Sequence, residues 1–308
     1  MAPLLLCAIT AGHGQAADTP DTATASLPDV TVIAPKPPTE EQLAGEAVPH
    51  FVESHATPST VIHQLTRWRT GICPRTRGLS EATDQFITAR MRAIATAVGA
   101  PWDESPKCKP NVDILFTGEP QQVLDVILKQ NSERLGFHYK QQEKQLATFT
   151  LPIQGWYVTS TRNWTGHEVI DDAAPLGVVE GKIRHQGGSK VPPGEPGSRL
   201  TNLRSSQVVL ALIVVDGNKA MEMNLKSLTD YLAMLTLSQA TPSDTCSQLP
   251  SIMDLLSTHC AGGDKPVEIT SGDLAFLRAL YRANLETPIE LEQSNIENAM
   301  MLDFHKKP

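Results

Sequence analysis

The residues that come nearest to a catalytic pattern are His167, Glu168 and Asp171, which read H-E-x-x-D. A zinc peptidase holds its metal with two histidines four residues apart on one helix face, and the glutamate after the first histidine acts as general base. Here an aspartate stands in place of the second histidine, Gly166 precedes the pattern, and no apolar helical stripe runs through it. The sequence therefore favours a solvated turn over a metal site, and we predict neither a metal nor any other cofactor.

The cysteines are better suited to disulfide bonds than to nucleophilic chemistry. Cys7 falls in a predicted signal peptide, and removal of that peptide leaves four cysteines. An even number in an oxidising compartment favours two disulfides, for which three pairings are possible. The pairs Cys73–Cys108 and Cys246–Cys260 close the shortest loops. A zinc site of four thiolates is the alternative, but the sequence has no C-x2-C pair to begin one.

The other residues that could do chemistry are isolated and do not form a complete motif. The chain has no G-x-S-x-G elbow and no glycine-rich phosphate loop. Asp230 and Asp254 could act as acids, although such residues more often cap helices, form salt bridges or face water. His259 adjoins Cys260, but adjacent residues rarely reach the geometry of a Cys/His pair. A hydrolase acting on peptide or cell-wall material would need four residues to converge in one cleft: His167, Glu168, Asp230 and His259.

Composition and charge narrow the compartment and the partners. The net charge is -8, whereas a general nucleic-acid binder needs a basic face, so nucleic acid is not an expected partner. Residues 1–16 contain a short apolar run and end in small residues, which is typical of a signal peptide. A buried N-terminal helix or strand is the alternative, since no Lys or Arg precedes Lys36. We expect an exported protein, periplasmic or secreted, with no integral membrane span.

The sequence divides the mature chain into an arm and one domain. Residues 17–60 are rich in Pro, Thr, Ala and acidic side chains, a composition typical of a disordered or extended linker. A single α+β domain is expected over 61–308, with a flexible, turn-rich insertion at about 171–205. One hypothesis is therefore an interaction module of the cell envelope that docks on an unknown partner through its N-terminal arm.

Hydrophobic spacing and end signals predict the elements of this domain. Ser80 and Gly99 bound a helix over 81–98 whose apolar face includes Phe86, and Thr270 with Asp273 resembles a capping box at the start of another helix. The continuous apolarity of 207–215 indicates a strand that is covered on both faces. Further strands are expected at 65–74, 111–116, 147–151 and 155–161, and further helices at 120–135, 225–238 and 289–304.

The order of these segments resembles a proteobacterial family of exported proteins of unknown function. The resemblance covers about 61–285 and is carried by Arg67-Trp68, Asn111–Phe116, Val208–Val215, Thr229–Met234, Pro250–Asp254 and Thr270–Tyr281. That family is similar to the metzincin zinc metallopeptidases, whose topology places the metal on a helix after the sheet. The resemblance implies a mixed sheet with packed helices in a degenerate zincin-like architecture, which in this chain is also disulfide-bonded.

The chain departs from the metallopeptidase pattern where the metal would bind. The helix expected at 224–238 contains neither histidine nor glutamate, and no histidine occurs between His185 and His259. We therefore expect a non-catalytic, metallopeptidase-like scaffold that uses its surface to bind an envelope protein or another ligand. The hydrolase and the arm-docking module stay as alternative hypotheses.

Overall fold

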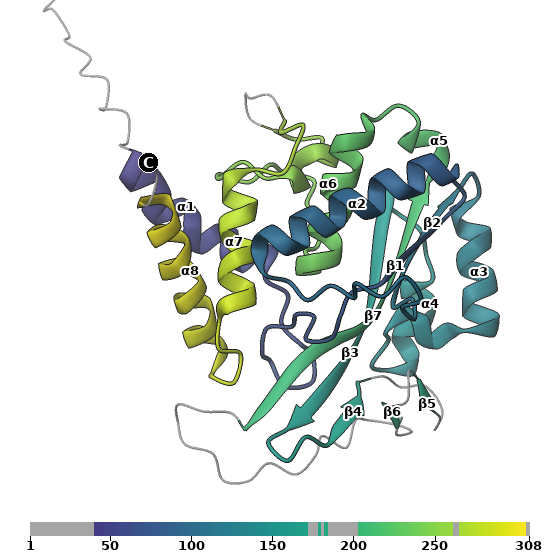
Figure 1. Cartoon of the computed structure of the whole chain (residues 1–308), viewed down its shortest axis with the longest axis horizontal. Coiled ribbons are helices and arrows are strands. Elements are labelled where there is room, and N and C mark those ends of the chain that lie inside the picture. Colours follow the sequence, from purple (N-terminus) through teal and green to yellow (C-terminus); the bar gives the residue numbers. More distant parts are fainter. Residues whose placement is uncertain (1–39, 172–177, 180–181, 184–202, 261–264, 306–308) are drawn as a thin grey trace, which may run out of the picture. The chain divides into compact units, whose positions relative to one another are not determined.

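The structure is a computed structural model that describes residues 40–171, 178–179, 182–183, 203–260 and 265–305 (Figure 1). The chain divides into two compact units, Met1–Pro37 and Pro38–Pro308, and every described residue belongs to the second. The predicted signal peptide at 1–16 and most of the predicted insertion at 171–205 lie outside the described residues. None of the described helices combines the length and the apolar character that crossing a membrane requires.

A mixed five-stranded sheet in the order β1-β2-β7-β3-β4 forms the centre of the domain. Its strands are β1 (Pro74–Arg77), β2 (Val112–Thr117), β3 (Ile153–Asn163), β4 (Glu168–Ile170) and β7 (Arg204–Asp216). β1, β2 and β7 run parallel, whereas β3 is antiparallel to both β7 and β4. β5 (Val178–Val179) and β6 (Lys182–Ile183) pair separately. The mixed sheet and its helices confirm the predicted α+β class.

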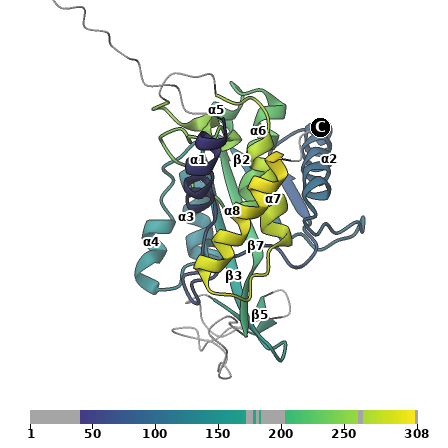
Figure 2. The same cartoon turned by 90° about the vertical axis from the view of Figure 1, so that its left-hand side faces the viewer.

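Helices cover both faces of the sheet, and a group of helices packs beside it (Figures 1 and 2). The described α-helices are α1 (Glu40–His55), α2 (Glu81–Val98), α3 (Pro120–Gln130), α4 (Glu143–Leu146), α5 (Gly217–Ala220), α6 (Leu225–Ser238), α7 (Ser271–Arg282) and α8 (Ile289–His305). Short 3-10 helices occupy Ser132–Leu135, Lys140–Gln142 and Ile252–Leu256. α7 packs against α8, which in turn packs against α1.

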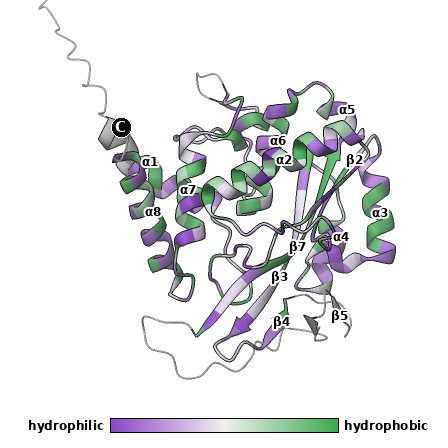
Figure 3. Cartoon of the chain, in the orientation of Figure 1, coloured by the Kyte–Doolittle hydropathy of each residue, from purple (hydrophilic) through white to green (hydrophobic). Residues whose placement is uncertain are grey.

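The central strand β7 packs against helices on both faces, as its continuous apolarity predicts. Ala211, Ile213 and Val215 belong to the core that contains α2 and α6, whereas Leu212 and Val214 belong to the core that contains α3. Because successive side chains of a strand point to opposite faces, a strand covered on both sides must be apolar throughout. The ends of β3 and β7 that approach β4 are instead hydrophilic (Figure 3).

Local sequence signals place the helix ends as predicted. The Ser80 hydroxyl accepts a hydrogen bond from the Thr83 amide at the start of α2, and Gly99 ends that helix with a φ of 77°. At the start of α7, Thr270 and Asp273 form a reciprocal capping box. Each cap satisfies backbone groups that have no partner within the helix.

Two of the predicted strands are wrong. The chain from 65 to 73 makes isolated bridges, at Leu65, Trp68 and Ile72, each to a different segment, and therefore forms no continuous strand. β1 is accordingly confined to Pro74–Arg77. No strand forms at 147–151, and β3 begins only at Ile153.

The predicted linker over 17–60 is wrong for residues 40–55, because they form α1. Val48, Phe51 and Val52 are buried in the main core, and the rings of Phe51 and Phe276 meet edge to face with centroids 5.7 Å apart. Apolar residues at i, i+3 and i+4 give a helix one face to bury, which outweighs the polar composition of the segment. The domain therefore includes α1 and begins before the predicted residue 61.

Both predicted disulfides are present. Cys73–Cys108 joins the start of β1 to the loop before β2, and Cys246–Cys260 closes a loop that contains the 3-10 helix Ile252–Leu256. In the chain-entropy account, closing loops of these lengths stabilises the folded state by about 3–4 kcal/mol each.

Candidate functional site

The H-E-x-x-D residues lie on the hairpin that joins β3 to β4. Asn163 and His167 belong to an exposed turn, in which the His167 amide donates to the Asn163 side-chain oxygen at 2.9 Å. Glu168 begins β4 and accepts hydrogen bonds from the side chains of Ser160 and Gln207. The predicted solvated turn is thus correct for His167 and wrong for Glu168, because β4 continues the pairing of β3 beyond the turn.

Asp171 is also buried and not solvated. Its carboxylate accepts hydrogen bonds from the hydroxyls of Thr159 at 3.0 Å and Thr161 at 3.1 Å. These threonines are two positions apart on β3, so their side chains lie on the same face of the sheet. The carboxylate therefore tethers the end of β4 to β3. Across the part of the chain that the structure describes, no three His, Cys, Asp or Glu side chains are grouped so that they could hold a metal ion.

Asp230 and Asp254 have structural partners. Asp230, in α6, is fully buried and accepts two hydrogen bonds from Arg90 on α2, one of them 2.6 Å long, and a third from the Ile269 amide at 2.9 Å. Asp254 accepts a hydrogen bond from the Ser251 amide at 3.0 Å and completes the capping box of the 3-10 helix. The two acids thus form a salt bridge and a cap, which are the usual roles of such residues.

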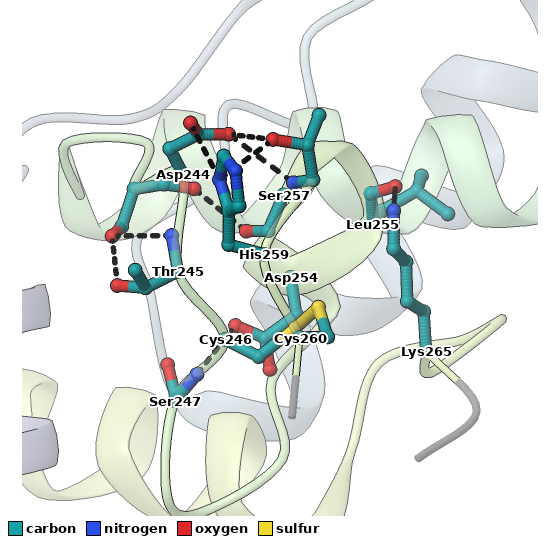
Figure 4. The surroundings of a disulfide bond; sticks show 12 residues. Asp244, Thr245, Cys246, Ser247, Asp254, Leu255, Ser257, His259, Cys260 and Lys265 are labelled. Carbon is teal, nitrogen blue, oxygen red and sulfur yellow. Dashed lines mark hydrogen bonds and ion pairs between the residues drawn. A yellow bond between two sulfur atoms is a disulfide. The ribbon is translucent and has the colours of Figure 1, made fainter. Parts of the chain in front are cut away.

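His259 points away from the neighbouring disulfide and towards Asp244 (Figure 4). Its Nδ1 atom lies 3.0 Å from an oxygen of the Asp244 carboxylate, and both side chains are mostly exposed. Hydrogen bonds from the hydroxyl and the amide of Thr258 lower the pKa of Asp244, and the contact with His259 adds to that effect. These contacts join the two ends of the loop that Cys246–Cys260 closes, and they do not form a Cys/His pair.

The four residues that the hydrolase hypothesis requires do not converge. His167 and Glu168 lie beside β4 at one end of the sheet, whereas Asp230 lies in α6 towards the other end (Figures 1 and 2). His259 belongs to the disulfide-closed loop and pairs with Asp244. The geometry therefore gives that hypothesis no support.

A buried hydrogen-bonded chain joins His55, Ser251 and Asp273. The His55 Nε2 atom lies 3.2 Å from the Ser251 hydroxyl, and that hydroxyl lies 2.6 Å from an oxygen of the Asp273 carboxyl group. The other ring nitrogen of His55 lies 3.0 Å from the Phe51 carbonyl. Burial lowers the pKa of His55 to about 4 and raises the pKa of Asp273. The Ser251 hydroxyl donates to the Asp273 carboxyl group and accepts from the Met253 amide at 3.1 Å.

The residue types of this hydrogen-bonded network match those of a serine hydrolase, but their arrangement does not. In a Ser-His-Asp triad the aspartate orients the histidine, which takes the proton of the serine. Here Asp273 contacts the serine and the backbone of Phe51 orients the histidine. All three side chains belong to residues that are at most 4% exposed, so a substrate cannot reach Ser251. We therefore infer that this hydrogen-bonded network has a structural role and holds α1 against the Cys246–Cys260 loop and α7.

Glu292, in α8, is a second buried group whose pKa is shifted. Its carboxyl group accepts a hydrogen bond from the Leu65 amide at 2.8 Å. Burial raises the pKa of Glu292 to about 7, against the smaller opposing effects of the hydrogen bonds to Leu65 and Thr287 and of the nearby Arg67. The ionised form of Glu292 therefore destabilises the folded state relative to the protonated form.

His55 and Glu292 are expected to give opposing pH dependences of stability. His55 binds a proton near pH 6.5 in the unfolded chain but only near pH 4 in the folded protein. Acidification from pH 7 to pH 4 therefore destabilises the fold by about 3 kcal/mol. Glu292 binds its proton near pH 7 when folded and near pH 4.5 when unfolded, so the same acidification stabilises the fold by about 3 kcal/mol.

Two variants separate these contributions by urea unfolding at pH 7, 5.5 and 4.5. Glu292→Gln is expected to lose stability more steeply than the parent protein as the pH falls, because it lacks the stabilising contribution of Glu292 and keeps the destabilising contribution of His55. His55→Gln is expected to lose it less steeply. The same slope in all three proteins would show that neither group titrates in the folded state as described.

A pocket of about 330 Å³ lies at the carboxyl ends of the three parallel strands. Leu79 follows β1, Gly118 follows β2 and Gly217 follows β7, and all three residues line the pocket together with parts of α2, α5 and α6. No charged side chain lines it, so an apolar group can enter without burying an unpaired charge. In open sheets, ligands often bind outside the carboxyl ends of strands whose connections leave on opposite faces. β2 leads to α3 on one face, and β1 and β7 lead to α2 and α6 on the other.

Sequence analysis missed this pocket, although one signal was present. A glycine follows each of the three parallel strands directly: Gly78, Gly118 and Gly217. Gly78 has a φ of 89°, and a Cβ atom at that position would lie 2.1 Å from the Phe116 carbonyl oxygen. Only glycine therefore allows β1 to end as close to β2 as it does.

The mouth of the pocket exposes large apolar side chains. Met221 is 80% exposed and Leu79 is 38% exposed, and both line the pocket. Phe86, on α2, does not line the pocket but is also exposed. This is contrary to its predicted place on the buried face of α2, because it lies about 100° around the helix from the buried Ile87. Methionine side chains are flexible and adapt to different apolar partners. The pocket is thus suited to binding an apolar group.

The comparisons with known proteins leave the family open. No family model, no curated protein and no solved structure matches this chain. The resemblance to exported, distantly metzincin-like proteins therefore stays a prediction. The function has to be argued from the pocket and from the partners of each polar residue.

Proposed function

We propose that the protein is a non-catalytic binding protein of the periplasm, and that its site is the pocket at the carboxyl ends of β1, β2 and β7. The observation that carries this proposal is an uncharged cavity whose mouth exposes Leu79 and Met221. Its volume of about 330 Å³ is at the lower end of the range for small-molecule sites, so it suits one apolar ring or chain.

The cell compartment and the ancestry of the scaffold are part of the same proposal. Two disulfides favour an oxidising compartment, which agrees with the signal peptide predicted at 1–16. A degenerate metallopeptidase-like scaffold is supported by the position of α6, which follows β7, the longest strand of the sheet, after the single turn of α5. In α6 the buried carboxylate of Asp230 binds Arg90, and no histidine is present to bind a metal.

The neutral fluorescent dye N-phenyl-1-naphthylamine tests the pocket. We expect the dye to bind the parent protein with an increase in fluorescence. Ala220→Phe is expected to weaken binding by about tenfold or more, since Ala220 lines the pocket and the added ring occupies the space of the ligand. Thermal unfolding of the variant shows whether its fold is intact.

Ala93→Phe is the matched control, because it makes the same change on the exposed face of α2, about 15 Å along the helix from Thr83. It is expected to leave dye binding unchanged. An equal loss of binding in both variants, or no binding to a folded parent protein, would refute the pocket as the site.

A further inference from the structure

Two arginines converge on one buried carboxylate near the edge of the sheet. Arg75, on β1, donates to one oxygen of Asp113 through Nε at 2.8 Å and through Nη2 at 2.6 Å, and Arg134 donates to the other oxygen through Nη1. The Asp113 side chain is 9% exposed, whereas those of Arg75 and Arg134 are 40% and 31% exposed. The carboxylate is therefore shielded, while both guanidinium groups reach solvent.

These side chains lie on the face of the sheet opposite α2. Asp113 is in register with Arg75 on β1 and with Leu212 on β7, and Leu212 belongs to the core that contains α3. The 3-10 helix Ser132–Leu135, which carries Arg134, packs on β7 and β3. β1 is the edge strand and lies beyond that cover, which is why the arginine of β1 stays open to solvent.

Arg77 adds a third cation to this surface. It lies two positions after Arg75, so its side chain is on the same face of β1, and it is exposed. Within the described part of the chain Arg77 forms no ion pair, and Glu133, the acid beside Arg134, pairs with none of the three arginines. Three guanidinium groups thus share one carboxylate, which leaves an excess of two positive charges.

The excess charge is held in a geometry that suits an oxyanion. A guanidinium group has five N–H donors, of which Arg75 uses two and Arg134 uses one on Asp113. Neither arginine has another hydrogen-bond partner among the residues that the structure describes. Because Asp113 already fixes both groups, an anion that bound them would lose less of its affinity to the ordering of side chains.

We propose that Arg75, Arg77 and Arg134 form a binding site for the phosphate group of a phosphate monoester. Such a group carries roughly 1.5 to 2 negative charges at pH 7 and three strong acceptor oxygens, which match the excess charge and the remaining donors. A carboxylate ligand offers one charge and two oxygens and matches them less well. The site is separate from the pocket of the proposed function, because none of the three arginines lines that pocket.

Isothermal titration of the full chain with glycerol 3-phosphate and with lactate tests the proposal. Both anions are small and carry a hydroxyl group, but one is a phosphate monoester and the other a carboxylate. At low ionic strength we expect glycerol 3-phosphate to bind at least about tenfold more tightly than lactate. Equal affinities, or no binding of glycerol 3-phosphate to the folded protein, would overturn the proposal.

The double variant Arg75→Gln/Arg77→Gln locates the site. It removes two of the three cations, while Asp113 keeps its ion pair with Arg134, so we expect the fold to survive. The affinity for glycerol 3-phosphate is expected to fall about tenfold or more. Thermal unfolding of the variant shows whether its fold is intact. Unchanged affinity in the folded variant would place the anion elsewhere and refute the site.

Arg92→Gln/Arg282→Gln is the matched control. It makes the same change in net charge at two exposed positions on α2 and α7 and should leave the affinity for glycerol 3-phosphate unchanged. An equal loss in both double variants would mean that the anion responds to the overall charge of the protein and not to a site. Binding of N-phenyl-1-naphthylamine should be the same in both variants and in the parent protein. Dye binding without phosphate binding would remove this inference and leave the proposed function intact.

Vesicles distinguish two sources of a phosphate monoester. Phosphatidic acid presents this group at a lipid surface, and phosphatidylcholine does not. Sedimentation of the protein with vesicles that contain phosphatidic acid, reversed by glycerol 3-phosphate, would support the site and identify a lipid headgroup as its ligand. Binding of glycerol 3-phosphate without sedimentation would support the site and identify a soluble phosphate ester.

Discussion

Replacing Arg90 with alanine is expected to lower the free energy of unfolding by about 3–5 kcal/mol, the loss typical of a buried ion pair from which one partner is removed. The Asp230 side chain is 0% exposed, and that of Arg90 is 27% exposed. Without the guanidinium group, the described donor that remains for the carboxylate is the Ile269 amide at 2.9 Å. The charge then stays in surroundings that solvate it poorly. Urea unfolding at pH 7 measures the loss.

Two further variants make this result specific. Arg92 lies on the same helix and pairs with Glu104 at 3.6 Å, but both side chains are about half exposed or more, so Arg92→Ala is expected to cost less than about 1 kcal/mol. Arg90→Lys keeps the charge but not the two parallel hydrogen bonds and should fall between the two. Equal losses for Arg90→Ala and Arg92→Ala would mean that the pair with Asp230 does not hold α2 against α6.

Replacing Asp273 with alanine is expected to cost about 4 kcal/mol, because it leaves several buried donors without an acceptor. The carboxyl group contacts the Ser251 hydroxyl at 2.6 Å and accepts from the Ile252 amide at 2.9 Å. It also accepts from the amide of Thr270 at 2.9 Å and from its hydroxyl at 3.0 Å. These contacts link the start of α7 to the disulfide-closed loop. Chemical unfolding under non-reducing conditions measures the loss while both disulfides stay closed.

Asp273→Asn is the matched control for the second variant. Asparagine keeps the shape of the side chain and one acceptor oxygen, so its loss is expected to be clearly smaller. Hydrogen exchange provides a second readout, since Ser251 also contacts His55 in α1. In Asp273→Ala the amides of α1 should exchange faster than in the parent protein. If their exchange is unchanged, the hydrogen bonds that join His55, Ser251 and Asp273 do not hold α1 in place.

Local sequence signals were sufficient for features that form between neighbouring residues. Ser80 and Gly99 bound α2 as expected, and Thr270 with Asp273 begins α7, because a cap needs only groups within one helical turn. An even number of cysteines indicated two disulfides and left three pairings open, and the structure contains the pairing with the shortest loops. The same kind of signal failed at 40–55, where polar composition concealed three apolar residues at helical spacing.

The features that carry the proposals were decided by tertiary structure alone. His55 and Ser251 are 196 positions apart, and no local pattern relates them. The pocket exists because the carboxyl ends of β1, β2 and β7 meet at one edge, and the order of strands in a sheet depends on crossover connections that sequence spacing does not encode. For the same reason the H-E-x-x-D residues were predicted as a solvated turn. The burial of Asp171 depends on two threonines of β3, whose approach is fixed only when β4 pairs with that strand.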